Sequence, residues 1–97
     1  MWMRKGEVFM KLRGTFTIRE VAGEIIAIPV GNTALELNGM IILNPVSRLI
    51  WEKLEKGSDV EQILDAMTEA FEVDRQVAAQ DLQEILDELS GQGMLED

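Results

Sequence analysis

The sequence predicts an α+β fold in which a small antiparallel sheet of three or four strands is followed by three helices. The prediction rests on two observations. Before about Asn44 the chain is rich in β-branched residues and turn signals, whereas helix-forming residues dominate after it. The chain has 97 residues, 46% of them apolar, which is enough for one domain with one modest core.

The first two strands are predicted to form a tight hairpin. We expect them at residues 15–21 and 24–30, joined by a two-residue turn. Phe16 and Ile18 alternate with polar residues, which is typical of a strand with one buried face. Pro29 has no N–H to donate, so one side of the second strand is predicted to be unpaired there.

A second hairpin is predicted at Asn38-Gly39, because both residues tolerate the positive φ of a two-residue turn. Its strands would be residues 34–37 and Met40–Leu43. The second of these is apolar at every position, so apolar groups point to both of its faces.

Three helices are predicted in the remainder. Asn44 and Pro45 supply the N-cap and the first residue of the first helix, and Gly57 ends it. Ser58 is predicted to cap the second helix, with Glu61 completing a capping box.

The third helix is predicted over residues 74–90, with Asp74 as its cap. After it, Met94-Leu95 are expected to fold back as an apolar lid. Its buried stripe falls at helical spacing and comprises Ala78, Leu82, Ile85, Leu86 and Leu89.

Composition argues against several kinds of chemistry. The chain has no cysteine and no histidine, which excludes thiol nucleophiles and thiolate metal sites and removes the usual acid–base group near neutral pH. No Asp-x-Asp-x-Asp-Gly calcium loop occurs, although a metal site made of carboxylates alone is conceivable at the acidic helices. We therefore expect no enzyme activity, no cofactor and no metal site.

The charge is unevenly divided. Fourteen of the eighteen acidic residues follow Trp51, and the net charge is −9. A strongly acidic region repels the phosphate backbones of nucleic acids. The third predicted helix also carries only one basic residue, Arg75, so no nucleic-acid partner is expected. No apolar run is long enough to span a membrane. Charged residues interrupt the N-terminal segment, which argues against a secretory signal peptide. The sequence therefore predicts a cytoplasmic protein without a membrane partner.

From Asn38 onwards, an ordered set of motifs resembles the PqqD-like family, named for a protein of pyrroloquinoline quinone biosynthesis. The set comprises a strand ending in Leu43-Asn44, the helical run Ile50-Trp51-Glu52-Lys53-Leu54, the segments Phe71-Glu72-Val73-Asp74 and Asp81-Leu82, and a final Gly93-Met94-Leu95. Two departures are Met94, where the family usually has Leu, and Pro45-Val46, where small or acidic residues are common. The resemblance defines a domain at residues 15–97 and leaves Met1–Gly14 as an N-terminal arm, predicted to be flexible.

This resemblance implies a winged helix-turn-helix fold that serves as a recognition element for ribosomally made, later modified peptides. Such a peptide chaperone of natural-product biosynthesis holds the leader of a precursor peptide and presents its core to a modifying enzyme, often a radical SAM enzyme. The peptide typically joins the sheet as an extra strand beside the third helix.

The predicted peptide-binding residues follow from this implied arrangement. On the last strand they are Met40, Ile41, Ile42 and Leu43, and on the third helix they are Val77, Asp81, Leu82, Ile85 and Glu88. Asp81 stands where the family has an acidic residue in this helix. Val77 beside the carboxylates of Asp81 and Glu88 would suit a leader with an apolar anchor and a basic group.

Other interpretations of these residues stay open. The strand at 40–43 would also suit full burial between layers, and the acidic helix face would suit a solvated rim. Trp51 is expected to pack in the core. An alternative function is a scaffold or self-associating subunit, a possible homodimer, whose groove is filled by its own arm or by another copy.

Overall fold

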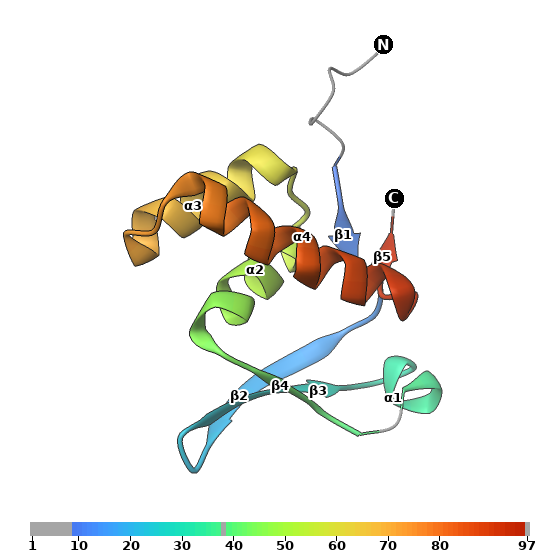
Figure 1. Ribbon diagram of the computed structural model, residues 1–97. Coiled ribbons are helices and arrows are strands. Elements are labelled where there is room, and N and C mark those ends of the chain that lie inside the picture. The colour runs from blue at the N-terminus through green and yellow to red at the C-terminus, as the bar shows by residue number, and fades with distance from the viewer. Residues whose placement is uncertain (1–8, 38, 97) are drawn as a thin grey trace.

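The computed structural model describes residues 9–37 and 39–96, and it confirms an α+β architecture with a small antiparallel sheet and three long helices (Figure 1). The three long helices lie on one side of a three-stranded sheet, and a short strand near each end of the described chain contributes to a separate two-stranded sheet (Figure 1). In chain order the elements are β1 (Lys11–Leu12), β2 (Phe16–Val21), β3 (Glu24–Pro29), α1 (Thr33–Glu36), β4 (Ile41–Leu43), α2 (Pro45–Lys56), α3 (Val60–Phe71), α4 (Arg75–Gly91) and β5 (Leu95–Glu96).

The first predicted hairpin is confirmed. β2 and β3 pair antiparallel from Phe16 opposite Pro29 to Val21 opposite Glu24. Ala22 and Gly23 in the turn have φ of 53° and 82°, the left-handed conformation that two-residue hairpins require.

Ala22 gives a first prediction, because an L-residue with a Cβ is strained at positive φ. Asn tolerates this conformation, so Ala22→Asn is expected to raise the free energy of unfolding by about 0.5–1 kcal/mol. Denaturant unfolding of the two proteins measures the difference. An unchanged or lowered stability would contradict the assigned turn.

The second predicted hairpin is wrong. Residues Thr33–Glu36 form the one-turn helix α1 instead of a strand, because the Thr33 hydroxyl oxygen accepts a hydrogen bond from the Thr15 N–H (2.8 Å) and fixes the turn to the start of β2. β4 then pairs antiparallel with β3, giving the order β2-β3-β4. Asn38 lies outside the described residues.

The start and end of α2 are confirmed. The Asn44 Oδ1 accepts from the Ser47 backbone N–H (2.8 Å), and the Ser47 Oγ accepts from the Asn44 N–H (2.9 Å), which completes a capping box. Pro45 is the first helical residue, and Gly57 with φ of 90° ends the helix. This capping box fixes the direction in which the chain leaves β4.

The predicted cap of α3 is wrong by one residue. Asp59 is the N-cap, and its carboxylate accepts from the Gln62 N–H (2.8 Å). Ser58 precedes the cap: its backbone pairs with Met10 in a two-way bridge, with N–O distances of 2.8 and 2.9 Å, and its hydroxyl donates to the Gln62 Oε1 (3.1 Å). Asp74 stands at the N-cap position of α4 as predicted, but its side chain makes no capping hydrogen bond.

β1 and β5 pair antiparallel, with Leu12 opposite Leu95. The Arg13 N–H donates to the Met94 carbonyl oxygen (2.8 Å), and the Met94 side chain is buried, so the predicted fold-back of the C-terminus is confirmed. Residues 1–8 of the predicted arm lie outside the described part of the chain.

The core lies between α2, α3, α4 and the inner face of the sheet. Phe16 from β2 and Trp51 from α2 pack edge to face, with ring centroids 5.0 Å apart. The largest fully buried side chains are Ile50, Leu54, Ile63, Met67 and Leu82. Among the described residues, no helix is both long and apolar enough to cross a membrane.

Candidate functional site

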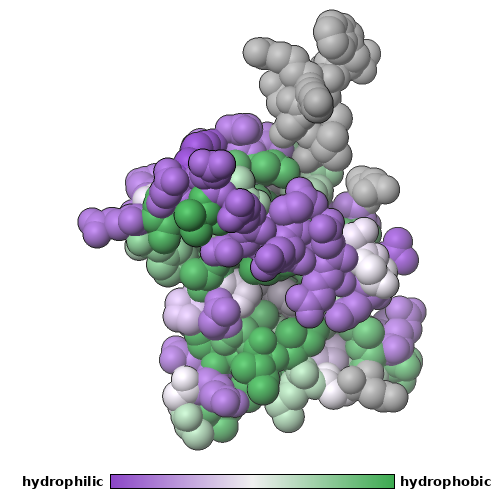
Figure 2. All heavy atoms as spheres, viewed as in Figure 1, coloured by the Kyte–Doolittle hydropathy of each residue, from purple (hydrophilic) through white to green (hydrophobic). Residues whose placement is uncertain are grey.

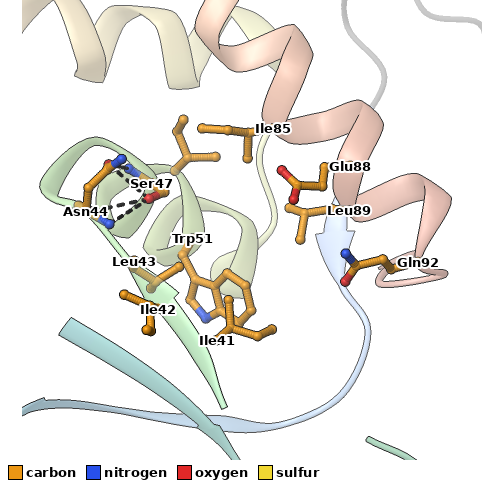
Figure 3. A pocket seen from close by; sticks show the side chains of 11 residues that line it. Ile41, Ile42, Leu43, Asn44, Ser47, Trp51, Ile85, Glu88, Leu89 and Gln92 are labelled. Carbon is orange, nitrogen blue, oxygen red and sulfur yellow. Dashed lines mark hydrogen bonds between the residues drawn. The ribbon is translucent and has the colours of Figure 1, made fainter. Parts of the chain in front are cut away.

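β4 is an edge strand of the three-stranded sheet. It pairs with β3 on one side, and in the described part of the chain no strand pairs with its other side. An edge strand presents unpaired backbone N–H and C=O groups to whatever lies beside it. Here α4 lies beside that free edge (Figures 1 and 3).

The side chains of β4 alternate as the sequence predicts. Leu43 is buried and Ile41 half-buried, whereas Ile42 is 66% exposed and Met40, which precedes the strand, is 62% exposed. β4 therefore contributes apolar surface to the core and leaves apolar surface uncovered. Figure 2 shows this uncovered apolar surface over the sheet, with hydrophilic residues covering α4 above it.

Between β4 and α4 lies a cavity of about 270 Å³ (Figure 3). β4 forms one wall, the first two turns of α2 form the floor, and the C-terminal half of α4 forms the other wall. We call this cavity the groove. Its lining residues are Ile41, Ile42, Leu43, Asn44, Ser47, Ile50, Trp51, Ile85, Glu88, Leu89 and Gln92.

The structure brings five of the nine predicted site residues together in the groove: Ile41, Ile42, Leu43, Ile85 and Glu88. Met40 precedes β4 and lines a neighbouring hollow with Leu37 and Ile28. Leu82 is 1% exposed and belongs to the core.

Val77 and Asp81 are exposed and lie outside the groove. Since residues four apart on a helix share a face, Val77, Asp81 and Ile85 form one stripe along α4. The stripe extends the α4 wall beyond the end of the groove, so a bound chain longer than the groove would pass along it.

The part of the chain that forms the groove matches a known protein family. The family model described as coenzyme PQQ synthesis protein D (PqqD) matches residues 31–95, which include β4, all three long helices and every residue that lines the groove. The chain belongs to the PqqD family.

A solved structure shares the fold. It is TbiB1 in complex with the TbiA(beta) leader peptide, at 26% sequence identity and a TM-score of 0.65. The similarity covers 89% of this chain and 94% of TbiB1. No curated protein matches the chain.

Several residues that line the groove of this PqqD-family chain were not predicted from the sequence. Leu89 and Gln92 follow Ile85 at spacings of four and seven, so helical periodicity contained the signal for them. Asn44 was interpreted as a helix cap and Ser47 was not singled out, and a capping signal gives no sign that the same turn lines a cavity. Trp51 was expected in the core, where it is 2% exposed, yet it also lines the groove.

The groove of this PqqD-family protein is apolar with one charged side chain, Glu88. Asn44 and Ser47 lie at one end and Gln92 at the other (Figure 3). Among the described residues no cluster of three or more His, Cys, Asp or Glu side chains is arranged to hold a metal ion. The arrangement suits binding of an extended apolar chain that carries a positive charge.

Proposed function

We propose that this chain is a non-catalytic peptide-binding subunit that holds the leader of a ribosomally made precursor peptide along β4 and presents the rest of the peptide to a separate modifying enzyme. The observation that carries the proposal is the free edge of β4 facing an apolar groove and the α4 wall. Family membership and the TbiB1 complex with a leader peptide support it.

The leader would bind by β-strand addition. Its backbone N–H and C=O groups would pair with the free edge of β4, and alternate side chains would enter the groove between Trp51, Ile85 and Leu89. The peptide-binding residues of this proposal are the five that line the groove, with Met40, Val77 and Asp81 at its margins. Leu82 would support the α4 wall from within the core.

The partner enzyme is part of the same proposal. On the family resemblance, it is a radical SAM enzyme acting in the cytoplasm, where ribosomal precursors are made. The acidic surface of α4 is unsuited to binding phosphates. Its one basic residue, Arg75, forms ion pairs with Glu61 (2.6 Å) and Asp65 (2.9 Å). We therefore propose peptide recognition over nucleic-acid recognition.

The test is calorimetric titration with the leader of a precursor peptide encoded beside the gene. We expect one-to-one binding with a dissociation constant between about 1 µM and tens of nanomolar, equivalent to about −8 to −10 kcal/mol. Absence of binding to the leader, together with dimerisation in sedimentation experiments, would replace this function with self-association.

Glu88 gives a prediction about the leader's chemistry. Because it is the one charged residue lining the groove, a leader with a Lys or Arg beside its apolar anchor should bind best. Glu88→Lys is expected to weaken binding of such a leader about tenfold, since a partly exposed charge pair contributes on the order of 1 kcal/mol.

Glu84→Lys is the matched control for Glu88→Lys. Glu84 is exposed on the same helix and does not line the groove, so this change alters the net charge equally. Calorimetry at low and high salt compares the two variants. Equal losses in both would show that overall charge, and not Glu88, selects the leader.

A further inference from the structure

The Trp51 side chain carries a buried hydrogen-bond donor that has no acceptor. Its indole Nε1 is shielded from solvent and finds no partner among the described residues. The indole nitrogen can donate but cannot accept. Burying a donor without an acceptor destabilises the folded state, so native proteins keep such groups rarely and often for a functional reason.

The ring is held in place beside the groove. Phe16 packs against it edge to face at 5.0 Å, and the residue as a whole is 2% exposed. In Figure 3 the indole lies on the floor of the groove between Ile41 of β4 and Leu89 of α4, with its nitrogen turned towards β4. The donor therefore lies at the wall along which a peptide would bind.

The polar groups that line the groove do not serve this donor. The Asn44 Oδ1 already accepts from the Ser47 N–H (2.8 Å) and the Ser47 hydroxyl (2.9 Å). Glu88 and Gln92 lie on the opposite wall (Figure 3). Among the described residues, therefore, no polar group of the groove accepts a hydrogen bond from the Trp51 indole.

We propose that the Trp51 indole N–H is the interior hydrogen-bond donor of the groove and donates to an amide carbonyl oxygen of the bound peptide. The inference rests on the proposed function, since it needs a peptide in the groove. Ile41 lies half-buried beside the ring, and its side chain would have to shift on strand addition to β4 for the nitrogen to reach the peptide. A site with a buried donor discriminates against any ligand that lacks the matching acceptor.

The first experiment follows the Trp51 indole resonance in the ¹⁵N-labelled full-length protein. The probe is a peptide selected from a random display library that shifts the amides of Ile41, Ile42 and Leu43 on binding. Trp2 supplies the other indole resonance, so the spectrum of Trp51→Phe assigns the two. We expect the Trp51 indole proton to move downfield at saturation and to exchange more slowly with solvent.

The outcomes distinguish failure of the Trp51 hydrogen bond from failure of the peptide-binding function. Saturated β4 amides with an unmoved Trp51 indole proton would overturn the inference and leave the peptide-binding function intact. If neither a selected peptide nor the leader encoded beside the gene shifts the β4 amides, the proposed function fails, and the inference fails with it.

A pair of variants distinguishes donation from packing. Trp51→Phe removes the donor and is expected to weaken the same peptide about fivefold to tenfold, with little change in the unfolding midpoint because the unpaired N–H is removed as well. Phe16→Leu alters the packing partner and keeps the donor, so it should lower the midpoint and leave the affinity of the folded protein unchanged. Unchanged affinity in Trp51→Phe, or an equal affinity loss in both variants, would overturn the proposal.

Discussion

Ile42→Lys is expected to weaken leader binding at least about thirtyfold, equivalent to roughly 2 kcal/mol, while the protein stays folded. Ile42 lines the groove at the free edge of β4, and its side chain is 66% exposed, so lysine fits there without disturbing the core. An added strand would have to desolvate the new charge. Natural proteins place lysine on edge strands because it prevents pairing with another chain.

Val21→Lys is the control for this prediction. Val21 points to the same outer face of the sheet as Ile42, is 54% exposed, and lies on β2, the opposite edge strand. The Val21→Lys protein should bind the leader with the same affinity as the unaltered protein. Calorimetry on both variants, with circular dichroism to check folding, gives the comparison. Equal affinity in the Ile42→Lys protein would place the peptide elsewhere.

The largest stability effect is expected at Gly57, the residue that ends α2. Its backbone has φ of 90° and ψ of 130°, a conformation that is strained for any residue with a Cβ. A Cβ there would also lie 2.7 Å from Cε2 of Phe9. Gly57→Ala is therefore expected to lower the free energy of unfolding by about 2–3 kcal/mol.

Gly91→Ala is the control, and its effect should have the opposite sign. Gly91 is helical at the end of α4, and a Cβ on it meets nothing within 4 Å. Alanine is the better helix former, so a gain of about 0.5 kcal/mol is expected. Denaturant unfolding measures both variants. A Gly57→Ala protein as stable as the unaltered one would show that α2 does not end in this strained turn.

The sequence predicted those parts of the fold that depend on local physical chemistry. The β2–β3 turn has two positive φ angles, and at the start of α2 the Asn44 side chain caps a helix whose first residue is Pro45. The hairpin at Asn38-Gly39 failed because long-range contacts decided it. Thr33 is fixed by Thr15, eighteen residues away, and nothing in residues 34–37 signals that contact.

The same distinction applies to the groove. Its β4 wall was predictable from the uninterrupted apolar run that ends at Leu43, and the resemblance added α4 as the second wall. Which side of α4 lines the groove was not predictable, because Leu82 and Ile85 belong to one apolar stripe and tertiary packing alone separates them. The unpaired indole nitrogen of Trp51 is likewise a property of the packed structure.

The central claim is that a leader peptide extends the sheet at β4, and amide hydrogen exchange tests it most directly. With saturating leader, the amides of β4 that face α4 should exchange markedly more slowly, while those of α3, far from the groove, keep their rates. A saturated complex in which Ile41, Ile42 and Leu43 exchange as fast as in the free protein would contradict strand addition at this edge.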